Sequence, residues 1–348
     1  MAYTTIDKPT DYFDTKLHTG TGASKTLAYD FEVYFYWTKM RSDTYPNVAL
    51  DSSRGNNALF RVNQTNAEVA AANTVSFGNA SGVTLGSDSS DYGVNKSSET
   101  FVGWAWKANG GTTSSNTDGS ITSTVQADTT AGFSIVTYTG NFTDNSTVGH
   151  GLGAIPKVII IKNRADAYNW VVYHGGLNFP TDDLLYLNLT NAANQHDPTF
   201  NNTAPTSSVF TIGAYELSND NTDGHVAYCF AEKQGYSKFG SYKGNGSTNG
   251  PFVYTGFKPA WVMLKRSSGV ADWNIFDNKR PGYNETNARL RANDNTAEST
   301  SDAGVDLLSN GFKCRLGSEF NADGTTNVYM AFAEHPFVSS RGVPVTAR

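Results

Sequence analysis

The sequence has little charge, few cysteines and no long hydrophobic run. Charged residues make up 17% of the 348 residues, below the quarter or so that is usual in globular proteins. Lysine and arginine number 26 against 32 aspartates and glutamates, which gives a formal net charge of −6. A nucleic-acid-binding surface needs a basic face to meet the phosphates, so this composition argues against that class.

The two cysteines, Cys229 and Cys314, are too few for a disulfide framework, and we expect them to be small core residues. The longest apolar runs, such as residues 226–231, are too short to span a bilayer. Residues 1–5 lack the basic and apolar segments of a signal peptide. These absences predict synthesis in a reducing cytoplasm and no membrane insertion.

The residues that are plentiful favour strands and turns. Aromatic residues reach 13%, glycine numbers 33, and asparagine, serine and threonine supply much of the polarity. Those three residue types prefer turns and strands to helix interiors. Hydrophobic residues make up 38% of the chain, too many for a disordered protein. The composition therefore predicts a soluble, globular, β-rich fold.

Three features recur along the chain at a spacing of roughly 100–125 residues. An apolar run ends in a lysine three times, at Lys39, Lys162 and Lys265. An asparagine precedes an alanine by four positions three times, at Asn63, Asn188 and Asn293. A late strand-like run of six residues has a valine at its second position three times, at Val102, Val226 and Val328. Because the three features keep register, we divide most of the chain into unit 1 (16–108), unit 2 (132–234) and unit 3 (235–337).

Within a unit the hydrophobic period is that of a strand. Val226, Tyr228 and Phe230 fall on one face, and the small Ala227 and Cys229 fall on the other. Both faces of this strand are thus expected to be partly covered. With turn clusters between such runs, the sequence predicts an all-β fold of three tandem, mutually similar antiparallel β-sandwich modules that resemble jelly rolls.

The segments between and around the units predict their connections. Residues 1–15 and 338–348 read as an N-terminal arm and a C-terminal tail. Residues 109–131 are rich in Gly, Ser and Thr and read as a linker, although the alternation at 121–125 favours an edge strand there. Units 2 and 3 are joined almost directly, which predicts a fixed mutual orientation.

No residue pattern points to a catalytic centre, a cofactor or a metal. The six histidines form none of the spacings of a zinc site. Asn219, Asn221 and Asp223 resemble the start of a calcium loop, but Phe230 stands where a bidentate glutamate should close it. An Asx-rich hairpin turn is the favoured interpretation of this string. We predict no catalytic residue, no metal and no cofactor.

The tryptophans suggest the one candidate binding feature. Trp37, Trp106 and Trp261 lie in apolar strands and are expected in the core. Trp170 and Trp273 follow polar residues and are candidates for partly exposed rings that stack on the faces of sugars. The alternative for these two, that they also belong to the core, stays open.

Several strings along the chain carry a family resemblance. They occur at residues 116–125, 130–136, 148–153, 162–164, 235–242 and 330–334. Together they resemble a repeat-containing domain of virion proteins from marine tailed bacteriophages, of the kind described as tail-fibre-like. The resemblance covers most of the chain and brings no catalytic or ligand residues with it.

The resemblance implies a non-enzymatic structural protein of an external phage appendage, a tail fibre or spike, in contact with host surface glycans. The expected partners are other virion proteins and further copies of this chain, with a homotrimer implied by analogy with phage fibres and no nucleic acid. The expected location is the virion surface after synthesis in the host cytoplasm. One alternative is a capsid decoration protein. Another is a depolymerase, which would need a pair of carboxylates in a groove.

Overall fold

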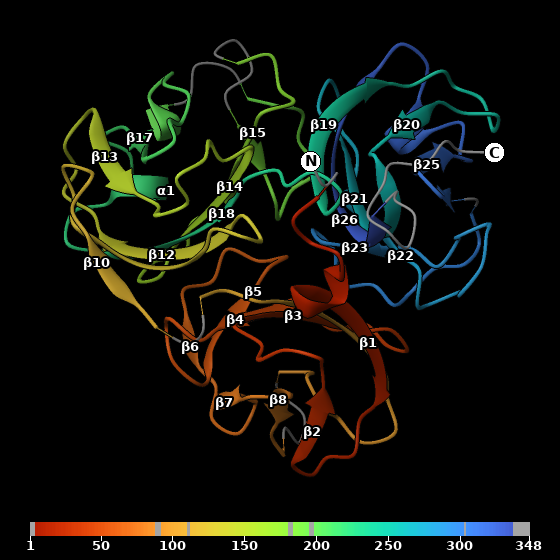
Figure 1. Cartoon of the computed structure of the whole chain (residues 1–348), viewed down its shortest axis with the longest axis horizontal. Helices are drawn as coiled ribbons and strands as arrows, with labels where there is room; N and C mark the ends of the chain where they lie inside the picture. Colours follow the sequence, from red (N-terminus) through yellow and green to blue (C-terminus); the bar gives the residue numbers. More distant parts are fainter. Residues whose placement is uncertain are drawn as a thin grey trace.

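A computed structural model of the chain describes residues 4–87, 92–109, 112–179, 184–194, 198–302 and 304–336. These residues form β-strands joined by loops, which confirms the all-β class. The helical segments are short: α1 (Glu216–Asn219) and the single 3₁₀ turns η1 (Pro9–Asp11), η2 (Pro198–Phe200) and η3 (Glu319–Asn321). Three lobes, one for each unit, surround a common centre (Figure 1).

Unit 1 contains a large sheet and a small one. The large sheet has the strand order β1 (Phe13–Thr19), β9 (Thr100–Trp106), β3 (Phe35–Met40), β4 (Val48–Asp51), β5 (Ala58–Arg61) and β6 (Val69–Ala70). The small sheet has the order β2 (Lys25–Ala28), β8 (Gly82–Leu85) and β7 (Val75–Asn79). The small sheet lies on the side away from the centre of the molecule (Figure 1).

Unit 2 has the same two parts. Its large sheet has the order β10 (Ser114–Asn116), β11 (Ser123–Asp128), β12 (Phe133–Thr139), β18 (Gly224–Phe230), β14 (Val158–Asn163), β15 (Val171–His174) and β16 (Leu185–Tyr186). Its small sheet pairs β13 (Ser146–Gly149) with β17 (Val209–Ile212).

Unit 3 repeats this division. Its large sheet has the order β19 (Ser237–Lys243), β26 (Thr326–Pro336), β21 (Phe257–Arg266), β22 (Asn274–Asp277) and β23 (Leu290–Arg291). Its small sheet has the order β20 (Phe252–Tyr254), β25 (Gly311–Cys314) and β24 (Val305–Leu308).

The three large sheets share one pairing scheme. In each of them the first strand of the unit pairs antiparallel with the last strand, which also pairs with the lysine-containing strand that follows in the sheet order. The registers agree as well. The facing pairs are Trp37 with Trp104, Ile160 with Tyr228, and Met263 with Met330.

The last strand of each unit separates two cores. In β18, Val226, Tyr228 and Phe230 belong to a core shared by all three units, whereas Ala227 and Cys229 face the core inside unit 2. The alternation in the sequence thus marks a strand that is covered on both faces, as expected. The larger side chains fill the centre of the molecule, and the smaller ones face the layer between the two sheets of unit 2.

Three aromatic rings in corresponding positions meet at the centre. Trp106, Phe230 and Phe332 come from β9, β18 and β26, and their ring centroids lie 5.6 to 6.4 Å apart. Each pair is T-shaped, with interplanar angles between 63° and 74°. Edge-to-face packing is one of the two preferred geometries for aromatic rings, because the positive ring edge meets the negative face. The shared core therefore joins the last strand of each unit to the other two.

The expected arm and linker contribute to the sheets. Ile6 and Phe13, from the expected N-terminal arm, are buried in the shared core, and β1 begins at Phe13. The linker supplies β10 and β11 to the unit 2 sheet. The alternating run at 121–125 leads into β11, which lies between β10 and β12, so the edge strand is β10 and not the predicted one. The expected C-terminal tail, 338–348, lies outside the described residues.

Candidate functional site

The contacts between units follow a threefold scheme at the level of the backbone. The N–H of Glu68 donates to the carbonyl of Arg164 at 2.9 Å, joining unit 1 to unit 2. The N–H of Ala193 donates to Ser267 O at 2.8 Å, joining unit 2 to unit 3. The third contact, from Glu298 N to Arg41 O at 2.8 Å, joins unit 3 to unit 1. Each donor lies five positions after the recurring asparagine of its unit, so one contact is made three times in a closed ring.

The recurring asparagines hold the residue that directly precedes an inner strand of the same unit, β4, β15 or β22. The side-chain oxygens of Asn63, Asn188 and Asn293 accept hydrogen bonds from the backbone N–H groups of Asn47, Trp170 and Trp273 at 2.9, 3.0 and 2.7 Å. A buried N–H without an acceptor is costly. The asparagine repeat therefore has a structural role that explains its spacing.

A buried ion-pair network closes the interface of units 1 and 2. Arg54 pairs with Asp51 and with Glu68, and the side chains of Arg54 and Asp51 are fully buried. Unit 2 completes the network from both sides: Arg164 donates to Glu68 at 2.9 Å, and the Tyr228 hydroxyl donates to Asp51 at 2.7 Å. Burial alone would raise the pKa of Glu68, but the hydrogen bond from Arg164 and the charge of Arg54 lower it below its ordinary value.

The interface of units 3 and 1 repeats this network. Arg280 pairs with Asp277 at 2.7 Å and with Glu298 at 3.1 Å. From unit 1, Arg41 donates to Glu298 at 2.8 Å, and the indole N–H of Trp104 donates to Asp277 at 3.1 Å. Burial opposes ionisation of Glu298, yet the hydrogen bond from Arg41 and the charge of Arg280 hold its pKa below the ordinary value.

The interface of units 2 and 3 uses a neutral histidine in place of the carboxylate. His174 ends β15 as Asp51 ends β4 and Asp277 ends β22. Its Nδ1 accepts from Gly176 N at 2.9 Å, so the ring proton is assigned to Nε2, which lies 3.1 Å from Tyr329 O in unit 3. Burial lowers the pKa of His174 to about 4, which keeps the ring neutral at pH 7.

The recurring lysines are buried next to these interfaces. Lys39, Lys162 and Lys265 are fully buried, and each donates to the carbonyl of the residue that follows it at 2.6 to 2.7 Å. Lys265 also donates to Thr190 O of unit 2 at 3.1 Å, and the Lys162 ammonium lies 5.7 Å from the ring centre of Phe60 in unit 1. Burial lowers their pKa values, to about 8 for Lys39 and Lys162 and about 7 for Lys265.

The two tryptophans proposed for sugar stacking are not at the surface. Trp170 and Trp273 are each 1% exposed and belong to the shared core. Trp170 packs edge-on against Phe60 of unit 1 with centroids 5.1 Å apart, and the indole of Trp273 donates to Tyr186 O of unit 2 at 2.8 Å. A buried ring has no face for a sugar, so the structure corrects the stacking hypothesis for both residues. Their polar neighbours in the sequence reflect the turns before β15 and β22 and not exposure of the rings.

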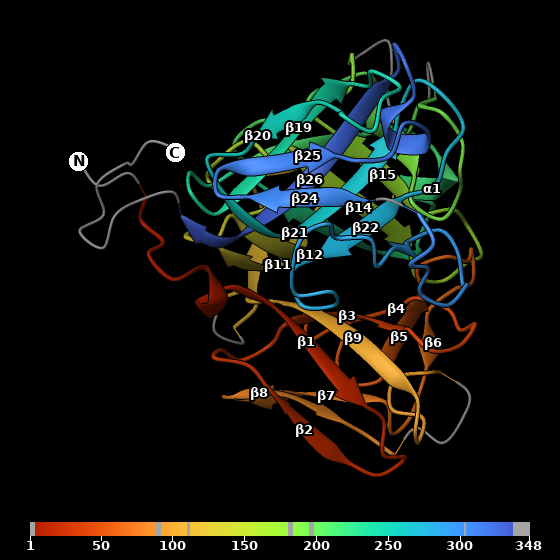
Figure 2. The same cartoon turned by 90° about the vertical axis from the view of Figure 1, so that its right-hand side faces the viewer.

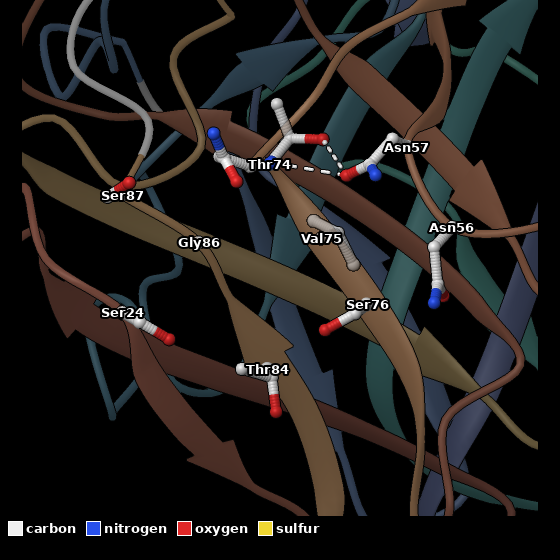
Figure 3. Close-up of a pocket in the computed structure, with 10 residues that line it drawn as sticks. Ser24, Asn56, Asn57, Thr74, Val75, Ser76, Thr84, Gly86 and Ser87 are labelled. Carbon is white, nitrogen blue, oxygen red and sulfur yellow. Dashed lines mark hydrogen bonds between the residues drawn. The ribbon is translucent and has the colours of Figure 1, made fainter.

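A polar pocket of about 240 Å³ opens on the small sheet of unit 1 (Figure 3). Its wall consists mainly of hydroxyl and amide side chains from β7, β8 and neighbouring turns: Ser24, Asn56, Asn57, Thr74, Ser76 and Thr84. Gly86 closes one side, where an added Cβ would lie 1.9 Å from the carbonyl oxygen of Asn73. None of the described residues that line it is charged, so these residues offer hydrogen bonds but no acid–base pair.

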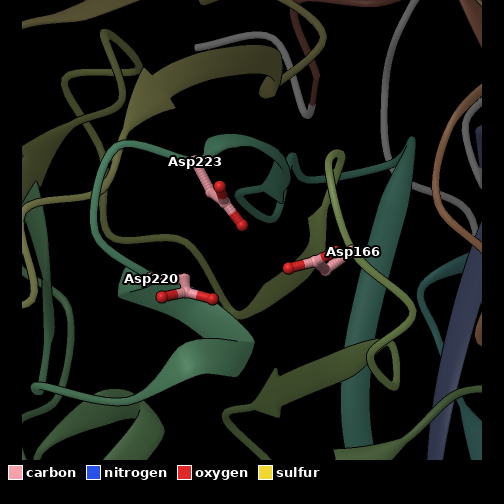
Figure 4. A group of neighbouring side chains, drawn as sticks. All are labelled: Asp166, Asp220 and Asp223. Atoms are coloured by element: carbon pink, nitrogen blue, oxygen red, sulfur yellow. The ribbon is translucent and has the colours of Figure 1, made fainter.

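Three carboxylates gather near the start of β18 (Figure 4). One oxygen from each of Asp166, Asp220 and Asp223 lies within 4.8 Å of the others. The Asn219 side chain of the calcium-like string points elsewhere, because its amide donates to Thr143 O and Gly213 O. Asp223 already accepts from Asn163 Nδ2 at 3.0 Å. A calcium ion takes six to eight oxygens, and we assign no metal to this group.

Among the described residues, no helix combines the length and the apolar character that crossing a membrane requires. The fold and its interfaces define the chain as an all-β protein whose three two-layered units close around one core. Residues 8–336 match the family described as "Domain of unknown function (DUF7483)", and the chain belongs to that family. Comparison with curated proteins and with solved structures gave no match.

Proposed function

We propose that this chain is a non-enzymatic structural protein of a tailed bacteriophage particle, carried in an external appendage such as a tail fibre or spike. The family resemblance of its sequence motifs suggests the setting. The closed ring of equivalent contacts supports the mechanical role, because each unit is held by both of the others.

A protein on the outside of a particle has to keep its shape without help from the cell. Here the units share one hydrophobic core, and two interfaces bury arginine–carboxylate networks that are costly to open. Such a rigid body transmits force without separation of its units. The sequence of its outward turns can vary to suit contact with other surfaces. Its expected partners are other virion proteins and host surface glycans.

In this proposal, the threefold arrangement that a homotrimer would supply is already present within a single chain. Within the described residues the threefold arrangement lies inside one chain, and each unit takes the place that one subunit of a trimer would occupy (Figure 1). We therefore propose that the chain attaches to the particle through its outer surface and leaves its inter-unit contacts intact.

Capsid decoration is the second candidate, and the shape of the molecule favours it. The three lobes cluster together in Figure 1, and neither view shows a shaft among the described residues (Figures 1 and 2). A body with threefold character suits a lattice point of threefold symmetry on a head. A depolymerase has the least support: the described residues that line the pocket in unit 1 include no carboxylate, and Glu68 and Glu298 are held by arginines.

Imaging of intact particles tests the proposal. Particles of a phage that encodes this chain are labelled with an antibody raised against it and viewed by electron microscopy. Label on the tail supports the appendage, and label spread over the head favours decoration. Purified particles that lack the chain in mass spectrometry would overturn both. Shortened chains after incubation with host surface polysaccharide would instead establish the depolymerase.

A further inference from the structure

A second and larger pocket lies at the junction of units 2 and 3, where the connection between β18 and β19 meets β20. It measures about 480 Å³ and is lined by Glu232, Gln234, Ser237, Lys238, Tyr254 and Thr255. The strands β19 and β20 lie next to each other at the end of the molecule that carries the described N-terminal residues (Figure 2). Pockets of this size take small ligands when a few polar groups converge on them.

The strand β20 presents aromatic rings to the outside. Phe252 is 47% exposed and Tyr254 is 57% exposed, whereas Val253 between them is buried in the core of unit 3. Only Tyr254 of the two rings lines the pocket. Its hydroxyl has no hydrogen bond within the described part of the chain. An exposed tyrosine offers a flat apolar face together with a polar group.

Other polar groups that line the pocket are held in place. Glu232 accepts from the backbone N–H of Phe239 at 2.8 Å and from the Lys238 ammonium at 3.2 Å. A carboxylate has lone pairs for further donors, and the ammonium has further protons. The exposed side chain of Gln234 adds an amide that has no hydrogen-bond partner within the described residues.

The turn that brings these groups together depends on a glycine. Gly235 has φ of +77°, a conformation that L residues with side chains rarely adopt. A Cβ on this residue would also lie 2.9 Å from Cβ of Thr4. The tight turn places Gln234 and Ser237 on the wall of the pocket.

We propose that this pocket binds a neutral hexose unit of a glycan. The C–H face of the sugar ring lies on Tyr254, and neighbouring hydroxyls donate to Glu232 and accept from Lys238 and Gln234. The negative face of an aromatic ring attracts polarised C–H groups, and the mixed donors and acceptors match vicinal hydroxyls. The opposite charges of Glu232 and Lys238 balance, which favours a neutral sugar over an acidic one. The inference deepens the proposed function, which supplies the reason for meeting host glycans.

Saturation-transfer NMR on the full chain tests the site. The probes are methyl glycosides of glucose, galactose and mannose, each at millimolar concentration. We expect transfer to the ring protons of at least one of them. Binding should weaken by about tenfold in Tyr254→Ala, as loss of an aromatic contact implies, and several-fold in Glu232→Gln. Because Tyr254 is exposed, the variant should keep the circular dichroism spectrum of the wild type.

The matched control is Tyr283→Ala, which removes a ring that is even more exposed than Tyr254 and lies outside this pocket; it should leave binding unchanged. Failure of all three glycosides to receive saturation would overturn the proposal, as would binding that Tyr254→Ala leaves intact. The hexose site and the proposed function can be refuted independently. A chain found on particles that binds no hexoside refutes this site alone, whereas a hexose-binding chain absent from particles refutes only the virion role.

Discussion

The phenol of Tyr228 donates a hydrogen bond of 2.7 Å to the carboxylate of Asp51, across the interface of units 2 and 1. Its counterpart is the indole of Trp104, which donates to Asp277 of unit 3 at 3.1 Å. In both cases the donor lies on the last strand of one unit and the acceptor ends an inner strand of a neighbour. The last strands thus bind the neighbouring units through polar contacts as well as through the shared core.

Removing the arginine of the first network should be severely destabilising. Arg54→Met leaves Asp51 buried without its ion-pair partner. It also removes one of the two arginines that pair with Glu68. Breaking a buried pair from one side costs about 3–5 kcal/mol because a buried charge remains. Urea denaturation monitored by fluorescence should show a loss of that size in the free energy of unfolding.

The control for this prediction is Arg315→Met. Arg315 pairs with Asp306 at 2.7 Å, but its side chain is partly exposed, so the loss should be about 1 kcal/mol or less. Combining Arg54→Met with Asp51→Asn removes the unpaired charge and should restore part of the lost stability. Equal losses for Arg54→Met and Arg315→Met would contradict the role of the network.

The three recurring asparagines should be energetically similar. Asn63→Ala, Asn188→Ala and Asn293→Ala each remove the acceptor of a backbone N–H. An unsatisfied buried donor costs about 1–3 kcal/mol, and each variant should lose stability in that range. Asn79→Ala, whose side chain accepts from Ser81 N in an exposed turn, should cost clearly less. If one of the three variants Asn63→Ala, Asn188→Ala and Asn293→Ala lost as little stability as Asn79→Ala, the three sites would not be equivalent.

The buried lysines should make stability increase with pH. The unfolded chain holds a proton on each lysine up to its ordinary pKa of 10.5, whereas folded Lys265 releases it from about pH 7. The unfolded state therefore binds more protons, and the free energy of unfolding rises by as much as about 1.4 kcal/mol per pH unit for each lysine. Lys265→Met should show a smaller rise between pH 7 and 9 than the wild type.

The measurement stops at pH 9 because, above that pH, the buried thiol of Cys229 has the opposite effect on stability. Burial raises its pKa above the ordinary 9.0, so unfolding is favoured by ionisation above that pH. The control is Lys243→Met, at an exposed position, which should keep the slope of the wild type. A slope for Lys265→Met equal to that of the wild type would show that folded Lys265 keeps its proton throughout.

Acid should weaken the interface of units 2 and 3. Burial lowers the pKa of His174 to about 4 from its ordinary 6.5, so the unfolded chain binds a proton that the folded chain excludes. Stability is therefore lost as the pH falls from 6.5 towards 4. His18 and His225 have pKa values lowered to about 4 for the same reason and add to the loss. Denaturation at pH 6.5 and pH 5 should show a smaller loss for His174→Gln than for the wild type.

Exposed His335 provides the control for this prediction, and His335→Gln should lose as much stability as the wild type over the same range. The range ends above pH 4.5 because Glu68 and Glu298, with lowered pKa values, contribute their own loss below it. An unchanged acid loss in His174→Gln would mean that the buried ring does not stay neutral.

The repeats predicted more of the molecule than the composition did. The lysine and asparagine spacings led to three units, and these residues make equivalent hydrogen bonds in each of them. The alternation around Tyr228 predicted a strand covered on both faces. That one of these faces meets two other units could not be predicted, since periodicity shows that a face is buried but not what covers it.

The candidate sites were harder to predict. Trp170 and Trp273 were proposed as surface rings because polar residues precede them, and both are buried by neighbouring units. Tyr254 gave no distinct signal, because a short alternating run with aromatic residues is typical of any strand. Its exposure depends on the position of β20 at the edge of a small sheet, which only the tertiary structure supplies.

The central claim is that three units form one body, and pulse-labelling hydrogen exchange along a urea series tests it most directly. Mass spectrometry follows the amides of β9, β18 and β26, the last strand of each unit. We predict that all three lose protection at the same urea concentration, because each helps to form the shared core. Separate transitions, with one strand exchanging while the other two stay protected, would contradict the account.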